Sequence, residues 1–69
     1  MSLTKEMIMS IDSQVKIFSN TELLIFHQTH KNLYKNHPNS FDGYRVDRSY
    51  KEITERGITE QINEYAKYW

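Results

Sequence analysis

Apolar side chains recur at three- and four-residue spacing along most of this chain, and that period places them on one side of an amphipathic helix. The densest run is the stretch 21–35, TELLIFHQTHKNLYK. One face of a helix over this stretch carries Leu23, Phe26, His27, His30 and Tyr34, with Leu24 and Leu33 at its flanks. We expect the rest of the chain to fold around this segment.

Local signals mark both ends of this helix. Ser19 and Glu22 have the S-x-x-E spacing of a capping box, and Asn20 is an equally suitable cap one residue later. Pro38 disfavours helical geometry in the residue before it, and the residues that follow, NSFDG, are typical of turns. The sequence therefore predicts a helix over 20–36.

Residues 1–18 fit two periods. A helical stripe is formed by Leu3, Met7, Ile8, Ile11, Val15 and Phe18. In contrast, Val15, Lys16 and Ile17 alternate as in an edge strand. We favour a helix over 3–18, because the helical match is longer, Ser2 or Thr4 can cap it, and it contains no glycine or proline.

Residues 37–47 contain the only proline and one of the two glycines, and we predict an internal loop there. Phe41 and Tyr44 are unusual in a loop. They either fold back as a lid over the core or serve as anchors for a partner. We favour the lid, because a large aromatic area is rarely left exposed on a small monomer.

The segment 49–69 returns to a helical period, and Ser49 and Glu52 repeat the capping-box spacing. Gly57 marks a one-residue shift in the apolar stripe. Either a helix ends there in a left-handed cap, with Thr59 capping the next helix, or a single helix continues through Gly57 at a cost of about 1 kcal/mol. The shift favours a break, and we predict helices over 48–57 and 58–68.

Together these elements predict an all-α fold, a small bundle of three to four short helices. An N-terminal helical hairpin closes at Ser19 and Asn20, and the C-terminal segment packs across it. The 69 residues are expected to form a single helical domain, 1–69. A chain of this length buries only about 60% of the surface that its unfolded form exposes, and it has no cysteine for disulfides. Self-association or a partner is therefore expected to add stability.

Nine basic and nine acidic residues give a formal charge of zero, which removes the simplest argument for a nucleic-acid binder. The charge is unevenly spread, because basic side chains gather between residues 27 and 51 and acidic ones follow. No apolar run approaches the length of a membrane span, and the N-terminus lacks the order of a signal peptide. We expect a soluble, cytoplasmic protein that does not engage a membrane.

The histidines His27, His30 and His37 have the spacing H-x2-H-x6-H, and Asp42 would supply a fourth zinc ligand if the loop curled back. Packed or hydrogen-bonded histidines fit the same spacing, and we favour that interpretation, so no metal site is predicted. The carboxylates are dispersed, and no serine or cysteine nucleophile or phosphate-binding loop is recognisable. We expect no catalytic residues, no cofactor and no enzyme activity.

The stretch 49–62, SYKEITERGITEQI, resembles the first helix and turn of the helix-turn-helix family of DNA-binding modules. The resemblance implies that Gly57 makes the turn and that Ile53 and Ile58 pack between two helices. Glu60 and Glu64 depart from a DNA-binding pattern, because they would bring negative charge to phosphates. The alternative function is therefore a DNA-binding or transcription regulator that uses residues 49–69. Its candidate nucleic-acid contacts are Lys31, Lys35, Arg45, Arg48, Lys51, Thr59, Gln61 and Asn63.

Aromatic residues are the candidate contacts for a protein partner: Phe41, Tyr44, Tyr65, Tyr68 and Trp69. Tyrosine and tryptophan bury much area at low entropic cost and are common in binding hot spots, although core closure explains Tyr65 and Trp69 equally well. We expect a small non-catalytic protein that binds another protein, and a homodimer is included in that expectation. The abundance of Ile, Lys, Asn and Tyr suits an AT-rich genome, which favours a phage- or mobile-element-type regulator of a host protein.

Overall fold

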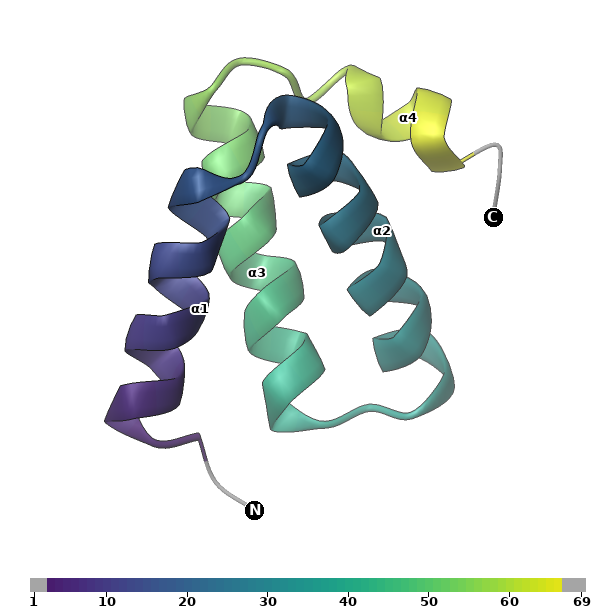
Figure 1. Cartoon of the computed structure of the whole chain (residues 1–69). Coiled ribbons are helices and arrows are strands. Elements are labelled where there is room, and N and C mark those ends of the chain that lie inside the picture. The colour runs from purple at the N-terminus through teal and green to yellow at the C-terminus, as the bar shows by residue number, and fades with distance from the viewer. Residues whose placement is uncertain (1–2, 67–69) are drawn as a thin grey trace.

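The computed structural model describes the backbone of residues 3–66 and the side chains of residues 3–64. Within these residues the chain forms four helices and no strand. The helices are α1 (Lys5–Ile17), α2 (Asn20–Asn36), α3 (Ser40–Glu55) and α4 (Gln61–Ala66) (Figure 1). The predicted all-α bundle is confirmed.

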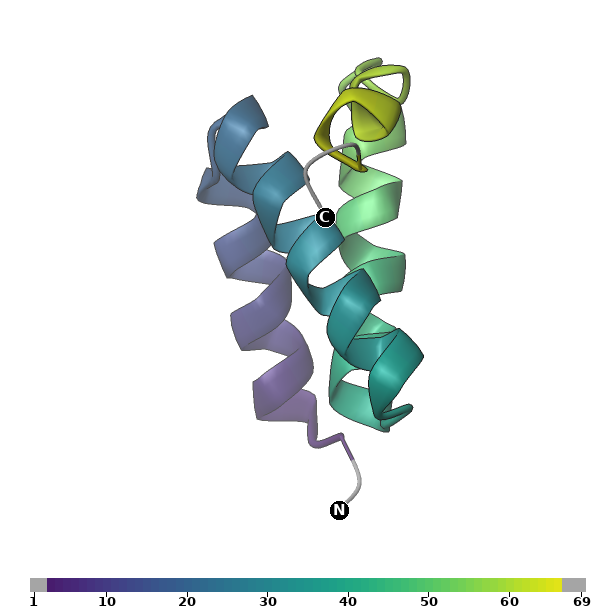
Figure 2. The ribbon, with the colours of Figure 1, turned by 90° about the vertical axis from the view of Figure 1, so that its right-hand side faces the viewer.

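Helix α3 is the centre of the arrangement. It packs most extensively against α2 and also against α1, whereas the short α4 contacts α2 (Figures 1 and 2). Helices α1 and α2 form the predicted N-terminal hairpin through the two residues Phe18 and Ser19. Each of them packs more closely on α3 than on the other, so α3 fixes the hairpin from one side. The sides of α1 and α2 that face away from their buried residues are together called the outer side of these helices.

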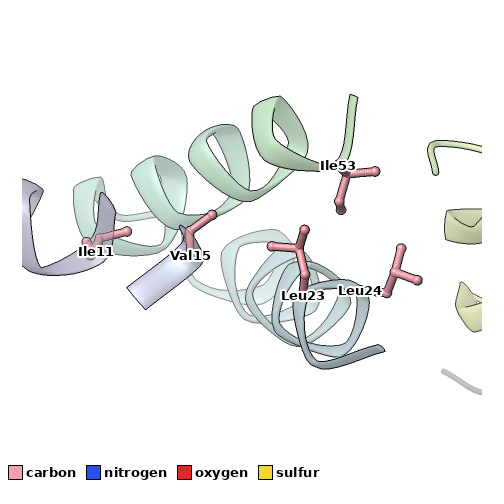
Figure 3. Packing of buried hydrophobic residues seen from close by; sticks show 5 residues of the cluster. All are labelled: Ile11, Val15, Leu23, Leu24 and Ile53. Atoms are coloured by element: carbon pink, nitrogen blue, oxygen red, sulfur yellow. The ribbon is translucent and has the colours of Figure 1, made fainter. Parts of the chain in front are cut away.

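The apolar core is small. Its fully buried members come from three helices: Ile11 and Val15 of α1, Leu23 and Leu24 of α2, and Ile53 of α3 (Figure 3). Leu23 and Ile53 point toward each other across the α2–α3 contact (Figure 3). Around this core pack the half-buried side chains Phe18, Phe26, Tyr44, Ile58 and Ile62. Since each fully buried aliphatic side chain contributes only about 1.5–3 kcal/mol, additional interactions matter for stability.

The starts of α1 and α2 follow the predicted capping signals. Thr4 caps α1, with its hydroxyl oxygen accepting from the Met7 amide. Ser19 and Glu22 form the predicted capping box, because the Glu22 amide donates to Ser19 Oγ and the Ser19 amide donates to Glu22 Oε1. These bonds satisfy amides that the helix itself leaves unpaired. Residues 5–17 are helical, so the strand alternative for this segment is wrong.

The predicted loop over 37–47 is wrong, because only residues 37–39 connect α2 to α3. Asn39 caps α3, since its side-chain oxygen accepts from the Asp42 amide at 2.9 Å. Its side-chain amide also donates to the His37 carbonyl oxygen at 2.7 Å and to Asp42 Oδ2 at 2.9 Å. Asn, Ser and Asp favour both turns and helix starts, and here the cap outweighs the cost of Gly43 in the first turn.

The predicted start of a helix at residue 48 is also wrong, and so is the capping role of Ser49. This serine lies in the middle of α3 and is fully buried. Its hydroxyl donates to the carbonyl oxygen of Arg45 at 2.6 Å, one turn earlier in the same helix. The Ser49 and Glu52 spacing therefore occurs inside a helix that had already begun at Asn39.

The predicted break at Gly57 is confirmed. Helix α3 ends at Glu55, and Gly57 has a φ of 71°, a left-handed conformation that favours glycine. The Ile58 amide donates to the Ile53 carbonyl oxygen, and the Gly57 amide donates to that of Thr54. This pair of bonds is a Schellman motif, and Ile58 packs against the core cluster that contains Ile53, an apolar contact that often accompanies the motif. Helix α4 then starts at Gln61, three residues later than predicted.

Candidate interaction surface

A buried polar pair joins α2 to α3. His27 Nδ1 lies 3.0 Å from Ser49 Oγ, and both residues are almost completely buried. Because the Ser49 hydroxyl proton is directed to the Arg45 carbonyl oxygen, Ser49 Oγ accepts a hydrogen bond from His27 Nδ1–H. Burial lowers the pKa of His27, and the charge of Lys31 lowers it further. A hydrogen bond to the Val46 backbone acts in the opposite direction and raises this pKa, but the net shift is downward. His27 is therefore a neutral donor in the core.

This pair superficially resembles a serine nucleophile with its base, but the geometry is that of a structural contact. The Ser49 side chain has no exposed surface, and its proton is held by the backbone. A substrate carbonyl cannot approach Ser49 Oγ without opening the α2–α3 interface. The pair therefore fixes the register of the two helices, as a satisfied buried hydrogen bond does.

A second histidine pair lies near the start of α3. His30 Nδ1 is 2.8 Å from Asp42 Oδ1, and Arg45 Nη1 approaches the same oxygen at 3.4 Å. The hydrogen bond from the Asn39 amide lowers the pKa of Asp42, and His30 and Arg45 lower it further. Partial burial raises this pKa, but the net shift is downward. Among the described residues, no three His, Cys, Asp or Glu side chains gather closely enough to hold a metal ion.

A polar network ties the middle of α1 to α3. Asp12 Oδ1 accepts from the Tyr44 hydroxyl at 2.6 Å and from Arg48 Nε at 3.1 Å. Arg48 and Arg56 both contact Glu52. Burial, together with Asp12, raises the pKa of Tyr44.

Arg56 also binds the C-terminal end of α1. Its Nη1 donates to the carbonyl oxygen of Phe18 at 2.8 Å, and its Nη2 reaches the carbonyl oxygens of Val15 and Lys16 at 3.3 Å. A cation is stabilising at this end of a helix because the last carbonyl groups are unpaired there. Arg56 thus acts as a cap on a helix distant from it in sequence.

The predicted nucleic-acid contacts lie on α2, on α3 and in the C-terminal segment. Arg45 and Arg48 are half-buried and paired with carboxylates. The lysines Lys31, Lys35 and Lys51 are exposed, on two different helices. In the C-terminal segment Thr59 is half-buried, whereas Gln61 and Asn63 are exposed.

Of the predicted partner-binding aromatics, the structure describes the side chains of Phe41 and Tyr44, both on α3. Phe41 is half-buried on α3, and Tyr44 packs against the core with its hydroxyl bound to Asp12. Tyr65 belongs to α4, but its side chain lies outside the description, and Tyr68 and Trp69 lie outside the described residues.

A groove of about 320 Å³ lies between α2, α3 and α4. It is lined by His27, Lys31, Val46, Asp47, Tyr50 and Ile62. The ring of Tyr50 lies 5.9 Å from that of His27, centroid to centroid, and almost half of the Tyr50 surface is exposed. A second hollow of about 500 Å³ lies between the ends of α2 and α3, near Leu3 and Tyr34.

The most distinctive surface is the outer side of α1 and α2. Five of the exposed large apolar residues lie on these helices: Met9, Ile17, Ile25 and Leu33, together with Tyr34, which lines the second hollow. Ile17 is 82% exposed, and Leu33 and Ile25 are 45% and 42% exposed. Sequence reasoning missed this surface because it followed the stripes that face the core, and Met9, Ile17 and Ile25 lie off those stripes.

Charged side chains are scarce along part of these two helices. Between Met7 and His30 the chain has only Asp12, Lys16 and Glu22 as formally charged residues. Asp12 is bound by Arg48, and Glu22 is held in the capping box. This depletion is visible in the sequence and is the signal that would have located the surface.

Helix α2 carries the most regular part of the outer surface. Ile25, Thr29 and Leu33 follow each other at four-residue spacing, and we call them the α2 stripe. The buried residues of α2, such as Leu23 and His27, face the other way. Phe26 flanks the stripe and packs between the rings of Phe18 and His30, at centroid distances of 5.1 and 4.5 Å. The helix that presents the stripe is therefore firmly held.

Comparison of the chain with protein-family models, with curated proteins and with solved structures found no match. Among the described residues, no helix combines the length and apolar character that crossing a membrane requires.

Proposed function

We propose that this protein is a non-catalytic interaction protein that binds another protein through the outer side of α1 and α2. The observation that carries the proposal is the presence of exposed aliphatic residues on these two helices together with the low charge of residues 7–30. The cores of protein interfaces are depleted in charged residues, and exposed apolar patches commonly mark interaction sites.

The distribution of polar chemistry supports the same proposal. The titratable side chains with resolved pKa shifts are engaged in contacts within the chain, such as His27 with Ser49 and Asp42 with Asn39. They hold helices together or cap them. A partner that covers the outer side of α1 and α2 would also add apolar burial to a chain whose own core is small.

Substitution of the α2 stripe tests this proposal. The double variant Ile25→Glu with Leu33→Glu places two charges on the stripe, and Thr54→Glu places one on an exposed position of α3 as the matched control. Tagged chains would be used to capture proteins from a lysate of the cells that encode them. We expect the wild type and the control to retain the same partner and the double variant to lose it.

Circular dichroism shows whether the variants keep the helical content of the wild type. If a correctly folded double variant captures the same protein as the wild type, the outer side of α2 is not the binding surface. A wild-type chain that captures nothing and stays monomeric also contradicts the proposal.

The second candidate function is DNA binding through residues 49–69. One observation favours it, namely that Gly57 makes a left-handed turn between two helices, as the helix-turn-helix resemblance implies. The pairing of Arg45 and Arg48 with carboxylates reduces the charge available to phosphates. Titration against random duplex DNA at low and moderate salt distinguishes the two functions. Salt-sensitive affinity supports DNA binding, and an absence of binding at micromolar protein counts against it.

A further inference from the structure

We propose that the groove between α2, α3 and α4 is the docking site of the chain's own C-terminal segment 67–69, and that it holds the side chain of Trp69. Trp69 is then an anchor within this chain rather than a contact for a protein partner. The described lining of the groove and the α2 stripe share no residue. The docking therefore goes beyond the proposed function and does not depend on it.

The lining of the groove suits one aromatic side chain that also carries a hydrogen-bond donor. Val46 and Tyr50 of α3 and Ile62 of α4 supply apolar surface. Asp47, an exposed residue of α3, supplies a carboxylate to the same groove, and Lys31 of α2 supplies an ammonium group. An indole matches all three features, because its ring is apolar, its N–H donates to a carboxylate and its π face attracts a cation.

The size of the groove limits what it can take. Its volume of about 320 Å³ lies at the low end of the range of small-ligand sites, about 300–1,000 Å³, so a single ring system fits it better than a folded partner. Docking there would cover Tyr50, almost half of whose surface is exposed. It would also add an aromatic side chain to the edge of a small apolar core, against which Ile62 already packs.

The connectivity of the chain brings Trp69 to this groove. Helix α4 spans Gln61–Ala66, and Ile62 in its first turn already lines the groove. Residue 69 follows Ile62 by seven positions, so a helix that continues past Ala66 carries both on one face. Without further helix, the three residues after Ala66 span at most about 10 Å. Because so short a tether gives a local concentration in roughly the millimolar range, a weak contact is enough for docking.

The fluorescence of Trp69 tests the docking directly, because the chain contains one tryptophan. With selective excitation of tryptophan, the folded chain should emit at shorter wavelength than the urea-unfolded chain, and acrylamide should quench it several-fold less. An excess of about tenfold of docked over undocked chains, which corresponds to about 1.4 kcal/mol, is enough for this difference. Both values should stay constant on dilution, because the contact is intramolecular.

Tyrosine variants decide whether the groove is the docking site. Tyr50→Ala removes a wall of the groove and should move the emission and the quenching toward the values of the unfolded chain. Tyr34→Ala is the matched control and should leave both values unchanged, because Tyr34 is exposed to a similar degree, 42% against 48%, but lines the second hollow. Asp47→Ala, at an exposed position, removes the acceptor for the indole N–H and should increase quenching to a smaller extent. Circular dichroism should show the same helical content for all variants.

The proposal is overturned if the folded chain emits and is quenched like the unfolded chain. It is also overturned if Trp69 is shielded but neither Tyr50→Ala nor Asp47→Ala reduces the shielding, or if Tyr34→Ala reduces it as much as Tyr50→Ala, since Trp69 then binds elsewhere. Shielding that disappears on dilution indicates that a second copy covers Trp69, and it excludes the intramolecular contact.

Discussion

Arg56 gives the sharpest test of how the bundle is held together. Its guanidinium contacts Glu52 Oε2 at 3.0 Å, Asn20 Oδ1 at 3.0 Å and three carbonyl oxygens at the end of α1. The side chain is only 20% exposed, so solvent screens these contacts incompletely. Replacement with methionine keeps much of the apolar stem and removes the charge and every donor.

The expected loss can be worked from these contacts. Hydrogen bonds to a charged group contribute about 1.5–3 kcal/mol, and a partly buried cation at a helix C-terminus adds up to about 2 kcal/mol, although the terms overlap. We therefore expect Arg56→Met to lower the free energy of unfolding by about 2–3 kcal/mol. For a domain of this size, 1 kcal/mol shifts the Tm by about 4–8 °C, so the Tm falls by roughly 10–20 °C.

Urea and thermal unfolding followed by circular dichroism measure this loss. Arg56→Lys keeps the charge without the planar fork and should lose roughly half as much. Arg45→Met is the matched control, because Arg45 is more exposed and has a single contact to Asp42 at 3.4 Å. We expect that control to lose less than about 1 kcal/mol. If Arg56→Met is no less stable than Arg45→Met, Arg56 does not cap α1 in the way described.

Further predictions concern pH, glycine and one buried amide. Because the pKa of His27 is lowered from 6.5, the unfolded chain takes up that proton more readily, so its contribution to stability is complete above pH 6.5 and declines as the pH falls below it. Melts between pH 8 and 5 should show this decline, and His27→Gln should flatten it. The pKa of Asp42 is lowered from 3.8, so its contribution persists above that pH and is lost as the pH falls further, a loss that Asp42→Asn should remove. Gly57→Ala should lower the free energy of unfolding in urea by about 1–2 kcal/mol, because residue 57 has a φ of 71°. Gly43→Ala should raise it by about 0.5 kcal/mol, because Gly43 lies within α3 and only the exposed ring of Tyr34 must shift. Gln28→Met should raise the stability by about 1 kcal/mol, because it removes a buried side-chain oxygen without a hydrogen-bond partner, and an unchanged or lower urea midpoint would contradict this.

The helical period and the caps of α2 could be predicted because they depend on neighbouring residues. The capping box of Ser19 and Glu22, the end of α2 before Pro38 and the break at Gly57 all follow from local backbone chemistry. The start of α3 was missed because Asn39 and Asp42 favour a turn and a helix cap alike. Only the packing of α3 on two neighbours decides between them.

Long-range contacts were beyond sequence reasoning. Nothing near Arg56 in the sequence indicates that its side chain would bind carbonyl groups of α1, about 40 residues earlier. The pairing of His27 with Ser49 likewise depends on the register of α2 against α3. The outer surface of the hairpin, in contrast, could have been predicted. The scarcity of charge between Met7 and His30 is visible in the sequence, beside the apolar period.

Site-specific photo-cross-linking tests most directly whether the outer side of α2 binds protein. A benzophenone amino acid at position 29 lies within the α2 stripe, and the same group at position 54 lies on the exposed side of α3 as a control. Illumination in the cells that encode the chain should attach a second polypeptide, either another copy or a different protein, at position 29 and not at position 54. No adduct at position 29, or equal adducts at both positions, would contradict the account.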